Sequence, residues 1–251
     1  FPEDENEAYT LPEQMGYYGS EGWFGSDPGS RLFGFFKDAI RHVDSVGSVP
    51  FCDYDVIIVF HAGSDWQNDV ATFYPDLAEI YPDIFIPSPY DLPTAYLILP
   101  DETLATCITQ GIVMPEHAYQ DGQTVLINGI LAHEFGHYLG LVDLYSTNNF
   151  TSNIGYFSLM DNGHAAGIQL VEEETGEVYD VFGLLPTYPS AWERAYLGWE
   201  NVVTLDEPIA DFELYACEIP LRPSKPTITK IDIDEFEYFL IENRQSEPWD
   251  D

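Results

Sequence analysis

Basic residues are scarce in this chain. Lysine and arginine together number 8 against 44 aspartate and glutamate residues, which gives a net charge of −36 over 251 residues. Such a surface repels phosphate backbones and anionic membranes, so we do not expect nucleic acid as a partner. The acids are scattered through apolar segments instead of forming one tail. We expect a solubilising or salt-adapted coat in preference to a store of cations, although adjacent carboxylates would also suit a bound calcium ion.

Cysteine is also rare, and long apolar runs are missing. Cys52, Cys107 and Cys217 are too few and too widely spaced for a disulfide scaffold or a cysteine-based metal cluster. They allow one disulfide and one remaining thiol, without fixing the pairing. No apolar run reaches the roughly 18 residues that span a bilayer, and the opening FPEDENEAYT lacks the features of a signal peptide. We expect a soluble chain with no membrane span.

What is present is enough apolar material, 45% of the residues, for one large domain or two fused lobes. Apolar residues at helical spacing predict a helix over 31–46, and apolar runs predict buried strands over 54–63 and 94–100. The segment 64–93 is rich in Pro, Asp and Tyr and predicts loops with one short helix. Alternating apolar and polar residues predict strands within 202–243.

Two further helices are expected. Residues 123–139 have helical periodicity, and Gly140 stands where a left-handed C-terminal cap is expected. Ser190 and Glu193 have the spacing of a capping box at the start of a short helix within 189–199.

The helix over 123–139 carries a metal-binding pattern. His133 and His137 lie four positions apart, about one 5.4 Å turn, so both rings can reach one ion. Glu134 is rotated by about 100° from His133, where its carboxylate can hold a water without ligating. Gly140 allows a sharp reversal, and Asp143 follows at the spacing of a third ligand. A histidine pair on a core face would be the ordinary alternative, but the full pattern favours zinc.

This run, HEFGHYLGLVDLY, followed by IGYFSLMDNG with Met160, resembles the metzincin layout of a zinc helix and a methionine turn. With DVIIVFHAG, SAWERAYLGW and YFLIENRQ in this order, roughly residues 50–245 resemble the secreted immune inhibitor A-type bacterial metalloproteases. The resemblance implies an α+β catalytic domain with a twisted mixed sheet packed on helices that include the zinc-binding helix. Its N-terminal subdomain would span about 1–140, and its C-terminal subdomain, with the methionine turn, about 141–251.

The resemblance also implies a ligand set. Asp143 stands where many metzincins have a third histidine, and Glu193 is the rival third ligand, unless it only caps its helix. Zinc is the implied cofactor. Calcium is a second expected ion, although the acidic insertion common before the HAG strand is reduced here to CDYD (52–55).

The implied chemistry is peptide hydrolysis by a zinc-activated water, with Glu134 as general base. Tyr145, Tyr156 and His164 are candidate oxyanion donors by position, and each is equally consistent with plain packing. Met160 is expected to pack as an apolar floor and not to ligate. His61, at the end of a predicted strand, is expected to be a structural histidine.

We therefore expect a secreted, monomeric zinc endopeptidase that acts on proteins or peptides. Two alternatives stay open. One is a non-catalytic secreted binding or adhesion module on the same scaffold, which the intact Glu134 disfavours. The other is a zinc hydrolase that cleaves amides or esters other than peptides.

Overall fold

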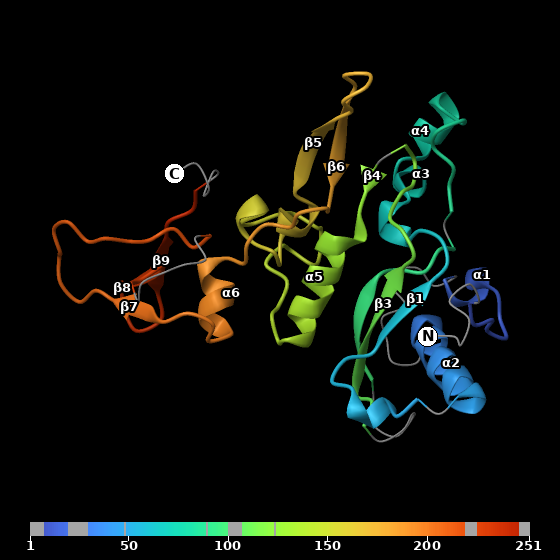
Figure 1. Cartoon of the computed structure of the whole chain (residues 1–251), viewed down its shortest axis with the longest axis horizontal. Helices are drawn as coiled ribbons and strands as arrows, with labels where there is room; N and C mark the ends of the chain where they lie inside the picture. Colours follow the sequence, from blue (N-terminus) through green and yellow to red (C-terminus); the bar gives the residue numbers. More distant parts are fainter. Residues whose placement is uncertain are drawn as a thin grey trace. The chain divides into compact units, whose positions relative to one another are not determined.

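The structure is a computed structural model that describes residues 8–19, 30–47, 49–88, 90–99, 107–122, 124–218 and 225–245. Contacts within the chain define two units. The first unit consists of Phe1–Tyr138 and Ala165–Leu185, and the second of Leu139–His164 and Pro186–Asp251. Helices and mixed sheets occur together, which confirms the expected α+β class (Figure 1).

The first unit is built on a mixed sheet of three strands in the order β1-β3-β2. β1 (Ile58–His61) and β2 (Ala95–Ile98) lie within the predicted strands, although residue 100, the predicted end of the second, lies outside the described part. β3 (Gln110–Pro115) runs parallel to β1 and antiparallel to β2. This central strand was not predicted.

Helix α2 (Arg31–Val46), which has the predicted bounds, covers one face of this sheet, and α1 (Met15–Tyr18) packs against α2. The helix comes so close to β3 that a Cβ on Gly111 would lie 2.1 Å from the ring of Phe36. Only glycine fits at this crossing. The core on this face contains apolar side chains of α1, α2 and the strands: Tyr18, Leu32, Phe33, Phe35, Phe36, Ile40, Leu92, Leu97, Leu99, Ile108 and Val113.

Helix α5 (Ile127–Tyr138) packs against β2 and β3. Its start corrects the prediction of a helix over 123–139, because Thr124–Val125 form the short strand β4, and residue 123 lies outside the described part. β-branched residues favour this extended pairing. At the other end Gly140 has a φ of 98°, which confirms the left-handed conformation expected there.

The segment 64–93 contains three short helices and not the single one predicted: η3 (Trp66–Asn68), α3 (Val70–Phe73) and α4 (Pro75–Ile80). The prediction missed two caps. The Asp65 carboxylate accepts from the backbone N–H of Asn68, and the Asp69 carboxylate accepts from that of Thr72. Both aspartates are buried, and these hydrogen bonds fix the backbone of the segment.

A β-hairpin that was not predicted completes the first unit (Figure 1). β5 (Gly167–Val171) pairs antiparallel with β6 (Val178–Phe182), and β6 pairs in parallel with β4 just before α5. The hairpin thus returns the chain to the first unit after the methionine turn.

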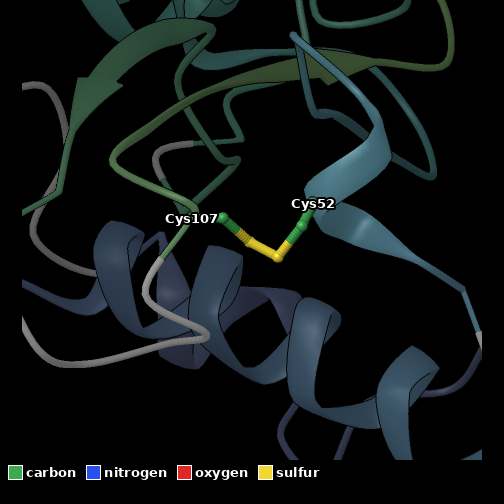
Figure 2. Close-up of a disulfide and its surroundings, with 2 residues drawn as sticks. All are labelled: Cys52 and Cys107. Atoms are coloured by element: carbon green, nitrogen blue, oxygen red, sulfur yellow. A yellow bond between two sulfur atoms is a disulfide. The ribbon is translucent and has the colours of Figure 1, made fainter.

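A disulfide joins Cys52, on the short helix η2 (Phe51–Asp53), to Cys107, with Cα atoms 5.4 Å apart (Figure 2). Both cysteines are exposed. Cys217 keeps its thiol and is fully buried in the second unit. The structure thus assigns the pairing that the sequence left open.

The second unit combines helix α6 (Ala191–Tyr196) with a sheet of order β7-β8-β9. These strands span Val202–Thr204, Ile228–Asp232 and Tyr238–Glu242, which confirms the strands predicted within 202–243. The capping box of Ser190 and Glu193 is present at the start of α6. Before α6 come the short helices η4 (Gly155–Phe157) and η5 (Asn162–Ala165). No helix in the described part of the chain is long and apolar enough to cross a membrane.

Candidate metal centre

Helix α5 presents two histidine rings side by side. The ring centroids of His133 and His137 are 4.8 Å apart, with the ring planes at 89°. His133 is buried and His137 is half-buried. Successive turns of one helix fix this separation, so the two candidate nitrogen ligands are positioned by the helix itself.

Asp143 supplies an oxygen to the same place. One ligand atom from each of His133, His137 and Asp143 lies within 4.8 Å of the others, a limit that includes the roughly 3.3 Å between two ligands of a tetrahedral zinc. Two imidazoles and one carboxylate are a donor set that suits zinc and leaves a coordination position for a substrate or water. These residues therefore fit the metal that the sequence pattern implies.

Glu134 is held against the sheet by a backbone group. Its side chain is buried, and its Oε2 accepts a hydrogen bond of 2.6 Å from the N–H of Tyr96. Tyr96 pairs with Ile112, whose own N–H points to β1, so the Tyr96 N–H points outward from the edge of β2. The Tyr96 ring also stacks on His137, with centroids 6.0 Å apart. One residue of the edge strand thus contacts both the expected base and an expected ligand.

The methionine turn lies in the second unit, with Met160 at its buried end. Met160 has no exposed surface, and its carbonyl accepts a 2.8 Å hydrogen bond from the N–H of Leu144. The neighbouring Asp161 carboxylate accepts from the N–H groups of residues 153, 154 and 155 at 2.7 to 3.0 Å. Burial by itself would raise the pKa of Asp161, but these N–H groups lower it below its ordinary value. Asp161 therefore stays ionised and anchors the turn.

Glu193, the rival third ligand, is fully buried beside this turn. Its Oε1 accepts from the Ser158 hydroxyl at 2.8 Å and from the Met160 N–H at 2.7 Å. Its Oε2 accepts from the Ser190 N–H at the start of α6. Both oxygens are thus engaged in hydrogen bonds, and Glu193 is not among the residues that gather at the metal site.

The comparison with protein families adds an independent observation. Residues 111–183 match the family model of the immune inhibitor A peptidase M6 catalytic domain. This segment is similar to the M6 peptidase catalytic domain. No curated protein and no solved structure is significantly similar to the chain.

The M6 segment begins in β3 and ends just after β6, so it contains α5, the three clustered residues and Met160. M6 peptidases are metallopeptidases, so the protein is a metallopeptidase, and the His-His-Asp group is its candidate metal site. Glu193 lies outside the matched residues.

The three candidate oxyanion donors have different surroundings. Tyr156 is 56% exposed on η4. The His164 Nδ1 donates to the Asp161 carbonyl at 2.6 Å, and the Tyr145 ring lies against Phe150 with centroids 6.3 Å apart. The choice among the three stays a prediction.

His61 ends β1 as a buried histidine. Its Nδ1 donates to the Ala62 carbonyl at 3.0 Å, and its Nε2 has no hydrogen-bond partner among the described residues. Burial lowers the pKa of His61 below its ordinary value, and the charge of His117 acts in the same direction. The negative charges of Asp65 and Glu116 act in the opposite direction and raise it, but less strongly.

Sequence reasoning missed two residues that contact predicted site residues. Tyr96 lies in a predicted strand, but only the strand's position at the sheet edge reveals its contacts with Glu134 and His137. Ser158 lies in the SLMDNG run, and its role depends on Glu193, which is 35 positions away. As for calcium, the described residues contain no second group of three metal-binding side chains, so the structure does not support that expectation.

Proposed function

We propose that the protein is a secreted zinc-dependent endopeptidase that uses Glu134 as general base and His133, His137 and Asp143 as ligands. The single observation that carries the proposal is the grouping of these three ligand atoms within 4.8 Å inside the segment matched by the M6 family. Glu134 adjoins His133 on the same helix, which supports its placement beside the ion. Calcium is not part of the proposal.

His133, His137 and Asp143 would hold a zinc ion, which would supply a Lewis acid that lowers the pKa of water and polarises a peptide carbonyl. Glu134 takes the water's proton at its carboxylate and delivers it to the amine that leaves. The hydrogen bond from the Tyr96 N–H to Oε2 limits rotation of this carboxylate, so the base is oriented before a substrate binds. An oxyanion donor from Tyr145, Tyr156 or His164 would complete the chemistry.

We also propose where the protein acts and on what it acts. The Cys52–Cys107 disulfide suits the oxidising conditions outside the cytosol, which supports secretion. Proteins and peptides are the proposed substrates. We propose that the enzyme acts as a monomer, which light scattering on the purified chain would test.

The test is hydrolysis of a reduced and alkylated protein substrate, with and without a zinc chelator. Cleavage that stops with chelator and returns with added zinc is expected. A chain that binds zinc but cleaves neither the protein substrate nor peptides would instead be a binding module or an enzyme for other amides and esters.

Glu134→Gln isolates the base. The variant should keep one zinc per chain and lose about 10²- to 10⁴-fold in kcat, the usual contribution of a general base. Glu173→Gln, on the exposed segment between β5 and β6, removes a carboxylate without touching the site and serves as the matched control. Turnover by Glu134→Gln at the rate of the control would refute the assigned role.

A further inference from the structure

We propose that Glu193 is a positioning residue for the metal ligand Asp143, and that it acts through the backbone of Met160. The inference rests on the ligand set of the proposed function. In this proposal Glu193 is not a metal ligand, and its role goes beyond capping α6. It sets the position of the third ligand, Asp143.

The first step is the attachment of the methionine turn to α6. Glu193 has no exposed surface, and its Oε1 accepts from the Met160 N–H at 2.7 Å and from the Ser158 hydroxyl at 2.8 Å. Its Oε2 is held by the Ser190 N–H in the capping box. The box therefore fixes the side-chain rotamer, and a fixed carboxylate in turn fixes the Met160 peptide.

The second step leads from Met160 to the loop that carries Asp143. The Met160 carbonyl accepts from the Leu144 N–H at 2.8 Å, and Leu144 directly follows Asp143. The Leu144 carbonyl accepts from the Asn153 side-chain amide at 2.9 Å, so both polar groups of this residue are held. A shift of the Met160 residue would therefore move the backbone next to the Asp143 side chain.

The other two ligands do not depend on this path. His133 and His137 belong to α5, whose own backbone hydrogen bonds set their spacing. Disturbing Glu193 should thus leave a two-histidine site with a misplaced carboxylate. Residues that orient metal ligands typically change metal affinity by about 10- to 100-fold when they are replaced.

Glu193→Gln is the direct test. A glutamine has one acceptor oxygen, so either the Met160 N–H or the Ser190 N–H would face an amide NH₂. The control is Glu242→Gln, the same change in a carboxylate of the same unit, whose Oε2 pairs with Arg194 at 3.0 Å. Zinc dissociation constants would be measured by competition with a chromogenic chelator, on apoprotein whose folding is checked by circular dichroism.

We expect Glu193→Gln to weaken zinc binding about 10- to 100-fold and Glu242→Gln to change it by less than about threefold. A double-mutant cycle separates positioning from general destabilisation. In an Asp143→Ala background, Glu193→Gln should have no further effect on the zinc dissociation constant, because the ligand it positions is gone.

Unchanged zinc affinity in Glu193→Gln, or a full additional loss in the double variant, would overturn the proposal. If Asp143→Ala binds zinc normally, the ligand set of the proposed function fails first; zinc loss in Glu193→Gln alone would then make Glu193 the ligand. Should Glu193→Gln not fold, Glu193→Asp decides the question, because a carboxylate on a side chain one methylene shorter cannot keep the contacts of Glu193 with both the Met160 N–H and the Ser190 N–H. Normal zinc affinity in that variant would also contradict the proposal.

Discussion

Removing the Cys52–Cys107 disulfide should cost a large part of the stability of the first unit. The two cysteines are 55 positions apart, and the loop between them contains β1, β2 and the aspartate-anchored helices. In the chain-entropy model, closing a loop of this length in the unfolded chain removes about 14 cal/mol/K, or about 4 kcal/mol at 25 °C. The expected decrease in melting temperature is about 8 to 16 °C, at about 2 to 4 °C per kcal/mol.

The assay is thermal unfolding with and without a reductant, alongside the double variant Cys52→Ser/Cys107→Ser. Both cysteines are exposed, so the reductant can reach the bond in the folded protein. Thiol titration checks the state of the bond: the reduced native chain should offer two reactive thiols, and buried Cys217 should react only after unfolding. In Cys217→Ser, the thiol that reacts only after unfolding should be missing, which would assign that reaction to Cys217.

The double variant provides the control, because reductant should leave its melting temperature unchanged. A reduced wild-type protein that melts within about 2 °C of the oxidised one would refute the entropic reasoning. One reactive thiol in the untreated unfolded chain is expected, and three would show that the bond does not form.

Three further predictions concern charge. Because burial lowers the pKa of His61, the unfolded chain binds the proton more readily; stability should be complete above about pH 6.5 and fall below it, with a weaker fall in melting temperature for His61→Phe. An equal fall in both proteins would contradict this. Arg194→Met breaks ion pairs with Glu200 and Glu242 at 3.4 and 3.0 Å and should cost about 3 to 5 kcal/mol in urea unfolding, whereas exposed Arg41→Met should cost about 1 kcal/mol or less. Sodium chloride should raise the melting temperature, because it screens the repulsion within a chain of net charge −36. Calcium should raise it no further than its ionic strength does, since the described residues contain no second metal-binding group. A larger rise with calcium at matched ionic strength would reveal a site outside this set.

The parts of the fold that follow from local pattern could be predicted from the sequence. Helix α2 has the predicted bounds because its apolar residues keep helical spacing over four turns against one face of the sheet. The pairing of His133 with His137 follows from helix geometry, and the Ser190–Glu193 box follows from its spacing. Each of these depends on residues within a turn or two of one another.

The parts that depend on distant partners could not be predicted. β3 is a continuous buried run with no polar alternation, so its period gives no signal, and its place is set by pairing with β1 and β2. The β5–β6 hairpin is mostly exposed, which removes the apolar pattern that identifies a strand. The role of Tyr96 and the second role of Glu193 arise from contacts 38 and 33 positions away along the chain.

The order of segments along the chain bears on how the protein is made. The first unit needs residues 165–185, because β6 is the partner of β4, yet 139–164 belong to the second unit. Neither unit is therefore a continuous stretch of sequence. On a ribosome, where N-terminal parts usually fold first, the first unit cannot be completed until residue 185 has emerged, by which time the methionine turn is outside but α6 is not. The helix with the proposed histidine ligands is thus synthesised well before Glu193, and the proposed third ligand, Asp143, should take its final place last.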